Sequence, residues 1–223
     1  MKLHIFGSCR VWDLAALMKV TILNDRTLMH DVSQYIQEIR FYKRIIDIPE
    51  KFYDIIYCNS YIKLLLSNKE TLLDKNLMSL DKADIVLIEI CTLKYLIHDN
   101  YTIDFNQTKK TSMSEKINID KYDKDLFVQK INELVNLIPN KKIVFIGHIF
   151  NPDLKIVKLE VRQTLNQWLS EIVSNIPNAY FFDPSICVME NGYYNMMVDG
   201  EHYSKKGQRI MKRRLRSFLL KIK

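Results

Sequence analysis

The sequence has few cysteines and no long apolar run. Its 223 residues include four cysteines, whose spacing matches neither a zinc site nor a C-x-x-C pair: Cys9, Cys58, Cys91 and Cys187. No apolar stretch reaches the length of a membrane span. The first ten residues, MKLHIFGSCR, lack the apolar core and small-residue cleavage site of a signal peptide. We therefore expect reduced, mostly buried thiols, no metal centre and a cytoplasmic location.

The composition is that of an ordinary globular protein, with 48% hydrophobic and 26% charged residues. A chain of 223 residues is long enough for one sizeable α/β domain and short for two. We therefore expect residues 1–223 to form a single domain.

The positive charge is concentrated at the C-terminal end. The segment 203–223 holds nine Lys or Arg and no acid, and without those nine charges the net charge of +7 becomes −2. Such a segment is either the solvated face of a last helix or a weak contact for an anionic surface, here Lys205–Lys223. Helical spacing favours the former, in the apolar residues Ile210, Met211, Leu215, Phe218, Leu219 and Ile222. Phe218 is the one aromatic residue among these basic residues. Aromatic and basic side chains therefore do not alternate here, and we expect no nucleic acid partner.

Five short apolar runs are typical of buried parallel strands. They are Lys2–Phe6, Asp54–Cys58, Asp84–Ile90, Lys142–His148 and Asn178–Asp183. Helical patterns lie between them, near residues 11–18, 35–46, 126–138 and 165–176. This alternation predicts a three-layer α/β/α sandwich around a five-stranded parallel sheet. The polar segment 99–125 has no clear period, so we expect an insertion or a lid there.

Two distant motifs carry the chemistry. Ser8 follows the first strand at a strand-to-helix corner, where Gly7 permits a tight turn. Asp199 and His202, in the stretch MMVDGEHYSKKG, precede the last helix in a D-x-x-H spacing. A serine hydroxyl needs a base to become a nucleophile, and a carboxylate orients that base. We therefore expect Ser8 as nucleophile, His202 as base and Asp199 as its orienting group.

These motifs resemble those of the SGNH or GDSL superfamily of serine esterases and acyltransferases. The likeness spans the chain, with the nucleophile near its start and the D-x-x-H near its end. The resemblance implies a flavodoxin-like α/β/α sandwich of about this size. The G-S-C start and the run FFDPSICVMENGYYNMMVDGEHYS are most similar to a branch found in polysaccharide and capsule biosynthesis. The resemblance to that branch implies that the protein transfers acyl groups to sugars or removes acyl groups from them.

The stabilisation of the oxyanion departs from the family pattern. The family places an asparagine after the third strand, where this chain has Glu89-Ile90-Cys91-Thr92. The backbone N–H of Cys9 is one candidate for the oxyanion hole, and the side chain of Asn59, which follows the second predicted strand, is the other. Asn59 is also a plausible turn residue, and the Cys9 thiol is a rival nucleophile that we expect to be buried.

Three further residues are candidates for substrate binding. Arg10 could bind an anionic group or form an ion pair, His148 ends an apolar strand, and Arg162 belongs to a helix near the same edge. Glu89 lies at an apolar strand end and needs a partner such as Arg10 or Arg162.

We hypothesise an esterase or O-acyltransferase that acts on O-acyl, above all O-acetyl, groups of a small molecule or polysaccharide. It requires no cofactor, although acyl-CoA is a possible donor for transfer. One alternative is a catalytically inactive module of the same fold that binds a sugar or an anion. Another is a protein that binds polyanions or membrane surfaces through its basic end.

Overall fold

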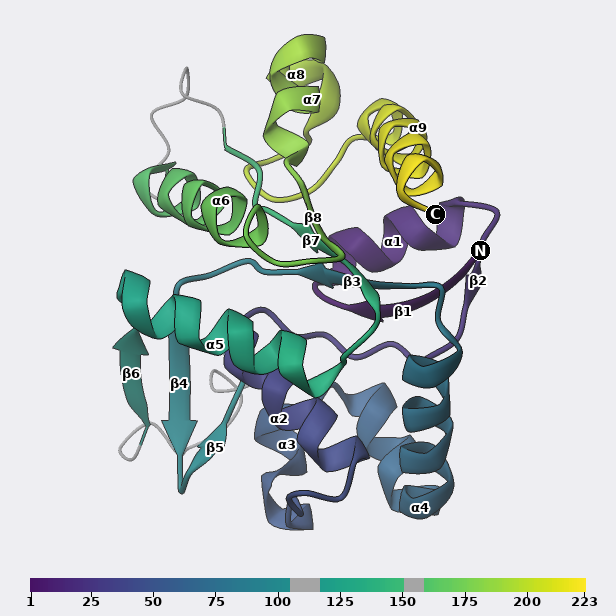
Figure 1. The fold of residues 1–223 in the computed structure, drawn as a ribbon, viewed down its shortest axis with the longest axis vertical. Coiled ribbons are helices and arrows are strands. Elements are labelled where there is room, and N and C mark those ends of the chain that lie inside the picture. Colours follow the sequence, from purple (N-terminus) through teal and green to yellow (C-terminus); the bar gives the residue numbers. More distant parts are fainter. Residues whose placement is uncertain (105–116, 151–158) are drawn as a thin grey trace.

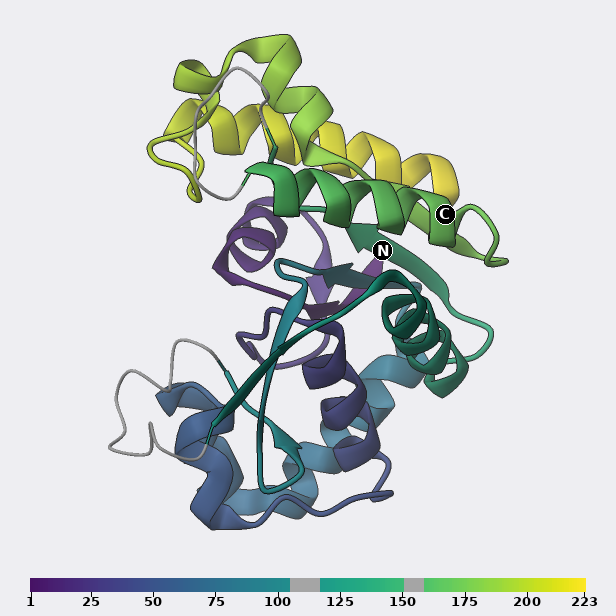
Figure 2. The ribbon, with the colours of Figure 1, turned by 90° about the vertical axis from the view of Figure 1, so that its left-hand side faces the viewer.

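A five-stranded parallel sheet forms the middle layer of the protein. The computed structural model describes residues 1–104, 117–150 and 159–223. The strand order is β2 (Thr21–Ile22), β1 (Lys2–Phe6), β3 (Ile85–Glu89), β7 (Lys142–Ile146) and β8 (Ala179–Phe182). Every pairing in this sheet is parallel. The expected α/β/α sandwich is confirmed, with helices on both faces of the sheet in two perpendicular views (Figures 1 and 2).

Helices of very different length surround the sheet. They are α1 (Cys9–Leu17), α2 (Val32–Tyr42), α3 (Tyr53–Ile56), α4 (Asn59–Lys82), α5 (Lys124–Leu137), α6 (Leu159–Val173), α7 (Pro184–Asn191), α8 (Tyr193–Met196) and α9 (Lys205–Ile222), and the short 3-10 turn η1 (Glu50–Phe52) precedes α3. The backbone of α4 is interrupted at Asn68, whose φ and ψ of −163° and 81° are not helical. Within the described ranges, none of these helices is both long and apolar enough to cross a bilayer.

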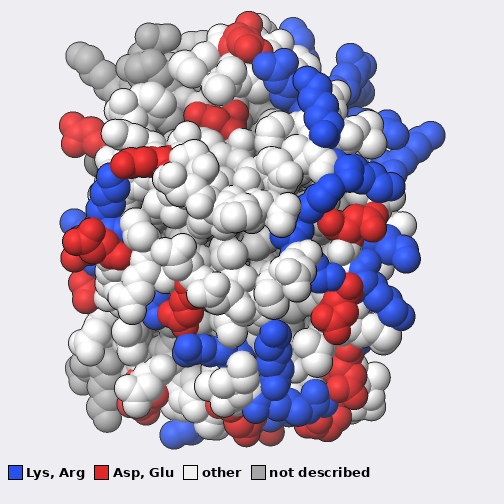
Figure 3. Space-filling view, in the orientation of Figure 1, with Lys and Arg blue, Asp and Glu red and all other residues white. Residues whose placement is uncertain are grey.

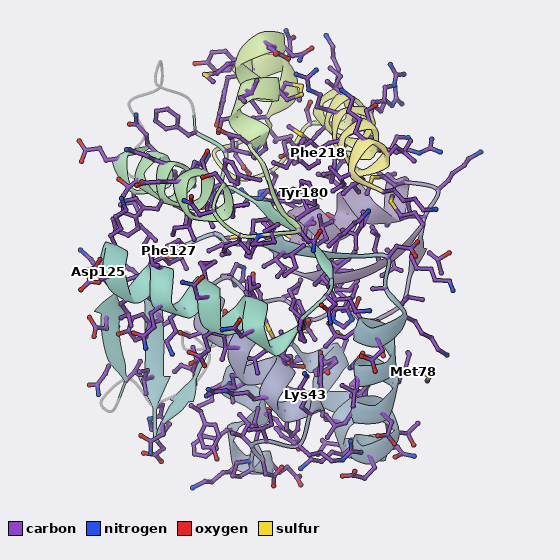
Figure 4. All side chains as sticks on the ribbon, viewed as in Figure 1. Lys43, Met78, Asp125, Phe127, Tyr180 and Phe218 are labelled. Carbon is purple, nitrogen blue, oxygen red and sulfur yellow. The ribbon has the colours of Figure 1, made fainter. Side chains whose placement is uncertain are left out.

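The strands divide the apolar side chains between two cores. On β1, Leu3 and Ile5 pack with α1 and α9, whereas Phe6 packs with α2, α4 and α5. This alternation follows from the two-residue period of a strand. Phe127 of α5 and Phe218 of α9, labelled in Figure 4, belong to the opposite cores. The two cores hold the sheet from both sides, as its continuous apolar strands require.

Side-chain caps fix where several helices begin. Ser8 caps α1 by accepting the backbone N–H of Arg10. At α2, Asp31 and Gln34 form a capping box, in which each side chain bonds the backbone of the other. Ser204 caps α9 by accepting the N–H of Gly207. One of these caps, Ser8, is the predicted nucleophile, and another, Ser204, follows the predicted base His202 by two residues.

Four of the five predicted strands are confirmed, as β1, β3, β7 and β8. The predicted strand Asp54–Cys58 is wrong, because residues 53–56 form α3. Both faces of this segment are buried, so its apolar run is continuous and its period does not distinguish helix from strand. The fifth strand is β2, a two-residue edge strand that is too short to leave a pattern.

The polar segment 99–125 contributes to a second, smaller sheet. Strand β4 (Lys94–His98) pairs antiparallel with β5 (Tyr101–Thr102) and with β6 (Asn118–Lys121). The small sheet contacts α2 through β5. Residues 105–116 lie outside the described residues, and a lid function for this segment stays a prediction.

Candidate active site

Ser8 lies at the corner between β1 and α1, with only 5% of its surface exposed. Its hydroxyl donates to Glu89 Oε2 at 2.5 Å, and its backbone N–H donates to the same oxygen at 3.0 Å. Because Glu89 ends β3, the neighbour of β1, the two strand ends bring these residues together. The predicted nucleophile is therefore held by a buried carboxylate.

Arg10 neutralises this carboxylate. Its Nε donates to Glu89 Oε1 at 3.0 Å, and the side chains of the two residues are 6% and 4% exposed. Burial alone would lower the pKa of Arg10, but the charge of Glu89 outweighs it and raises this pKa. The predicted partnership of Glu89 with Arg10 is confirmed, so the Arg10 side chain is engaged within the protein.

The remaining nitrogens of Arg10 contact residues that follow two strands, β7 and β3, and one loop. Arg10 Nη1 lies 3.2 Å from His148 Nε2 and donates to the backbone oxygen of Glu201 at 3.4 Å. Arg10 Nη2 donates to the Cys91 thiol at 3.5 Å. Since an arginine only donates, His148 Nε2 accepts, and its Nδ1–H faces the oxygen of Ile149 at 3.2 Å. His148 is thereby a neutral side chain, buried behind Arg10.

Asp199 and His202 form the expected pair. His202 Nδ1 lies 2.9 Å from Asp199 Oδ2, and Asp199 Oδ1 accepts the backbone N–H groups of Glu201 and His202 at 2.7 Å each. The hydrogen bond from His202 is the largest of the effects that lower the pKa of Asp199 to about 2. The carboxylate is therefore ionised at neutral pH and fixes the orientation of the imidazole ring.

Two arginines hold the loop that carries this pair. Arg162 Nη1 donates to the oxygen of Gly200 at 2.9 Å, and its Nη2 lies 3.5 Å from Glu201 Oε1. Arg10 binds the same loop from the side of Ser8. Burial and the nearby charge of Arg10 lower the pKa of Arg162. Both arginines position the D-x-x-H loop, and their predicted contact with substrate stays a prediction.

The structure differs from the expected triad at the contact between Ser8 and His202. Within the described residues the Ser8 hydroxyl bonds Glu89, and His202 Nε2 makes no hydrogen bond. The connection between the two runs through Glu89, Arg10 and the backbone of Glu201. Serine and imidazole therefore lie at the same edge of the sheet without a direct hydrogen bond.

Cys9 occupies the first position of α1. Its thiol is half-buried, and burial, followed by the charge of Glu89, raises the pKa of this thiol. A thiol with a raised pKa is a poor nucleophile at neutral pH. The backbone N–H of Cys9 makes no hydrogen bond to any described residue, as the first turn of a helix allows. This N–H is thus available as an oxyanion donor.

Asn59 does not occupy the position on which its predicted role depends. It follows α3 rather than a strand of the sheet, begins α4 and is exposed. No hydrogen bond in the described part of the chain joins its side chain to Ser8, Glu89 or Arg10. The prediction of Asn59 as a strand-end oxyanion donor is therefore wrong in its structural premise.

A second histidine–aspartate pair lies near the site and escaped the sequence reasoning. His30 Nδ1 lies 2.9 Å from Asp104 Oδ2, and the backbone oxygen of His30 accepts the N–H of Cys91. Burial alone would lower the pKa of His30, but the hydrogen bond and charge of Asp104 raise it. His30 follows the edge strand β2, whose two residues left no signal that could have placed it.

The described residues contain no group of three or more His, Cys, Asp or Glu side chains that could hold a metal ion.

Comparison with solved structures identifies the fold. A member of the lipolytic protein G-D-S-L family from Veillonella parvula DSM 2008 is 9% identical, with 99% of this chain and 98% of that chain covered and a TM-score of 0.55. A carbohydrate esterase family 3 protein from Talaromyces cellulolyticus is 12% identical, over 100% and 97% of the two chains, with a TM-score of 0.47. A family 3 carbohydrate esterase from Clostridium thermocellum is 13% identical, over 100% and 96%, with a TM-score of 0.44.

Comparison of the sequence identifies the family. No curated protein matches this chain. A family model described as the TviD N-terminal domain matches residues 1–116, from β1 through the second strand of the small sheet. The chain thus has the fold of the SGNH hydrolases, and it belongs to the TviD N-terminal domain family.

Proposed function

We propose that this protein is a serine-dependent enzyme that acts on O-acyl groups of carbohydrates. The observation that carries the proposal is the imidazole of His202, which Asp199 orients, in a loop whose Glu201 backbone oxygen accepts a hydrogen bond from Arg10 beside Ser8. A base braced in this way is the component that a serine hydroxyl needs to react at neutral pH. The SGNH fold and the loop positions of these residues support the same chemistry.

In the first half of the reaction, Ser8 Oγ attacks the acyl carbonyl carbon while His202 Nε2 takes the hydroxyl proton. The negative charge that develops on the carbonyl oxygen is stabilised by the N–H of Cys9 at the start of α1, where the helix dipole also favours a negative charge. Collapse of this intermediate breaks the ester bond, and His202 returns the proton to the leaving sugar oxygen. The acyl group then remains on Ser8.

Ser8 must change its hydrogen bond before it can react. A hydroxyl has one proton, so Ser8 cannot donate to Glu89 and to His202 at the same time. A rotation about the Cα–Cβ bond of Ser8 turns the hydroxyl group away from Glu89 and toward the imidazole of His202. The hydroxyl then donates its hydrogen bond to the imidazole. Arg10 remains paired with Glu89 during the exchange.

In the second half, water or a sugar hydroxyl attacks the acyl-enzyme. With water the protein is an esterase, and with a sugar hydroxyl it is an O-acyltransferase, for which acyl-CoA is a suitable donor. The substrate class is supported by the likeness of the C-terminal motif to the branch in polysaccharide and capsule biosynthesis, and by the match to the TviD N-terminal domain. We propose O-acetyl groups as the first to test.

A second candidate function has one observation in its favour. The Ser8 hydroxyl is bonded to Glu89 and not to His202, as expected of a binding module that retains the fold without turnover. Such a module would hold a sugar or an anion at the same edge of the sheet.

Labelling with a fluorophosphonate separates the two functions. We expect an adduct of one phosphonyl group on the peptide that contains Ser8, found by mass spectrometry. Ser8→Ala and His202→Ala should both remove it, whereas Ser67→Ala, at an exposed serine of α4, should keep it. Labelling should also survive Cys9→Ala, since the Cys9 thiol is not the nucleophile. A parent protein that remains unlabelled would support the binding module.

A further inference from the structure

The loop after β2 brings His30 to the edge of the sheet where Ser8 lies. A parallel bridge between Leu28 and Gly7 continues the pairing of β2 with β1 as far as the residue before Ser8. The backbone oxygen of His30 accepts the N–H of Cys91, just after the end of β3, at 2.8 Å. His30 is therefore held beside the ends of both β1 and β3.

The pair of His30 with Asp104 is better shielded from solvent than the pair of His202 with Asp199. His30 Nδ1 lies 2.9 Å from Asp104 Oδ2, and the two side chains are 24% and 3% exposed. The side chains of His202 and Asp199 are 58% and 53% exposed. The N–H of Asp104 donates to the oxygen of Ile55 at 2.9 Å, which fixes the carboxylate in turn. Within the described ranges His30 Nε2 makes no hydrogen bond, so this nitrogen is the one left for a substrate.

The two pairs reach this edge from opposite faces of the sheet. Tyr203, next to His202, packs in the core with α1 and α9, whereas Ile103, next to Asp104, packs in the core with α2, α4 and α5. Figure 2 shows the small sheet below the five-stranded sheet and α9 above it. The exposed cations of α9, in the upper right of Figure 3, lie on the face of His202. Since His202 serves the nucleophile and the leaving group, the carbonyl oxygen needs donors from another side.

Most backbone N–H groups at this edge are already bonded within the protein. The N–H of Ser8 donates to Glu89, and the N–H of Cys91 donates to the loop after β2. In that loop the N–H groups of residues 30 and 31 share Gln34 Oε1, at 2.7 and 3.2 Å. Of these backbone donors, the N–H of Cys9 is the one that bonds no described residue. An oxyanion hole with two donors therefore needs a side chain here.

We propose that the imidazolium of His30 is the second donor of the oxyanion hole, together with the N–H of Cys9. This role rests on the proposed function, because it requires an acyl group that Ser8 attacks. As the bond from Ser8 Oγ to the carbonyl carbon forms, the π electron pair of the carbonyl moves onto its oxygen. His30 Nε2–H donates a hydrogen bond to that oxygen and keeps its proton. When the intermediate collapses, the carbonyl re-forms and the ester bond breaks.

The charges around His30 favour its protonated form. Burial alone would lower the pKa of His30, but the hydrogen bond and charge of Asp104 outweigh it. The charges of Glu89 and Asp31 raise this pKa further, and Arg10, the ion-pair partner of Glu89, opposes the effect of Glu89. With Nδ1–H facing Asp104, only the protonated ring donates from Nε2. We therefore expect kcat to fall as the pH rises through the pKa of His30.

Turnover of p-nitrophenyl acetate by variants of the loop after β2 tests this role. His30→Leu should lower kcat about 10²–10³-fold with little change in KM, as the loss of one oxyanion donor does. His30→Gln retains a neutral donor, so it should lose less activity and should no longer show the fall of kcat at high pH. Arg26→Gln, in the same loop, changes a 46% exposed side chain that pairs with Asp13, and it should behave like the parent. Circular dichroism checks that each variant folds.

Asp104→Asn tests the pair itself. Without the anionic partner the ring loses its proton more readily, so the fall of kcat should move to lower pH. If His30→Leu does not fold, the pH profiles of His30→Gln and Asp104→Asn decide the matter.

The role of His30 and the proposed function can fail separately. A kcat of His30→Leu equal to that of the parent, with turnover that still depends on Ser8, would overturn the role of His30 alone. So would a fall of kcat at high pH that persists in His30→Gln, or a loss in Arg26→Gln as large as that in His30→Leu. Equal turnover by the parent and Ser8→Ala would instead reject the proposed function, and the role of His30 with it.

Discussion

Ser8 links helix formation to the buried ion pair beside it. As the cap of α1 its oxygen accepts the N–H of Arg10 at 3.3 Å, and as a donor its hydroxyl bonds Glu89. Hydrogen bonds among Ser8, Arg10 and Glu89 therefore fix the corner between β1 and α1 and the end of β3. They also fix the orientation of the Ser8 hydroxyl. Gly7 is part of this arrangement, because a Cβ there would lie 2.9 Å from Glu89 Cβ and 2.5 Å from Val11 Cγ1.

The ion pair between Arg10 and Glu89 should contribute strongly to stability. Arg10→Met leaves the Glu89 carboxylate buried without a counter-charge, and we expect the free energy of unfolding to fall by about 3–5 kcal/mol. Glu89→Gln should also destabilise, and the double variant should lose clearly less than the sum of the two. Urea unfolding of all four proteins gives this coupling.

Lys124→Met is the matched control for this cycle. Lys124 pairs with Glu171 at 2.8 Å, but the two side chains are 45% and 55% exposed. Its loss should cost about 0–1 kcal/mol, as for other exposed pairs. Strictly additive losses at Arg10 and Glu89 would show that the two side chains do not stabilise each other.

His4 should make the protein sensitive to acid. It is fully buried on β1, its Nδ1 lies 2.8 Å from Ser79 Oγ, and its Nε2 has no hydrogen-bond partner among the described residues. Burial lowers the pKa of His4 from 6.5 to about 3. Below pH 6.5 the unfolded chain therefore binds a proton that the folded protein does not, and stability falls by about 1.4 kcal/mol per pH unit toward pH 3.

His4→Gln removes this titrating group and retains a side chain that can bond Ser79. We expect the free energy of unfolding of this variant to depend less on pH between 6.5 and 4 than that of the parent, as measured by urea unfolding at several pH values. Identical pH dependences would show that His4 is not the source of the acid sensitivity.

At the scale of elements, continuous apolar strands were predictable and short or ambiguous ones were not. The runs that became β1, β3, β7 and β8 are long enough for their composition to identify them. Residues 54–58 have the same composition, but residues 53–56 form α3, since consecutive buried apolar residues such as Ile55 and Ile56 have no period that favours one structure. The break in α4 at Asn68 likewise has no simple signature, although Asn68 Oδ1 accepts the N–H of Thr71 and so caps the second half of the helix.

The candidate site was predictable where its contacts are local. Asp199 and His202 are three residues apart, so a tight loop brings them together whatever surrounds it. The pairs Ser8–Glu89 and His30–Asp104 join residues 81 and 74 positions apart. Such contacts depend on strand order, which periodicity does not give. The predicted role of Asn59 as an oxyanion donor depended on a strand at Asp54–Cys58, and the structure has a helix there.

Glu38 joins three helices and should give stability a second pH dependence. Its carboxyl on α2 accepts the hydroxyls of Tyr57, after α3, and Tyr61, on α4, at 2.6 and 2.9 Å. Burial raises the pKa of Glu38 from 4.5 to about 7. Between these pH values the folded protein keeps a proton that the unfolded chain releases, so this group makes stability fall as pH rises from 4.5 to 7.

Glu38→Gln should abolish this loss. We expect the free energy of unfolding of the variant to decline less than that of the parent as pH rises from about 4.5 to 7, in urea titrations at each pH. Glu171→Gln, at an exposed carboxyl of α6, should behave like the parent. If Glu38→Gln also behaves like the parent, the carboxyl is already ionised in the folded protein.

At the scale of the whole molecule, the site exists because the two ends of the chain meet. Ser8 belongs to the first strand and helix, whereas Asp199 and His202 precede the last helix, which packs on α1. Arg10 and Glu201, 191 positions apart, join these regions directly. A change that weakens the packing of α1 against α9 should therefore affect the site as well as the stability of the fold.

Turnover of p-nitrophenyl acetate by the parent and by Ser8→Ala tests the central claim most directly. If Ser8 is the nucleophile and His202 its base, Ser8→Ala should lower kcat by about a thousandfold or more while the protein stays folded. Addition of candidate sugars to the parent shows whether a hydroxyl competes with water for the acyl group. Equal rates for the parent and Ser8→Ala would contradict the catalytic role of Ser8.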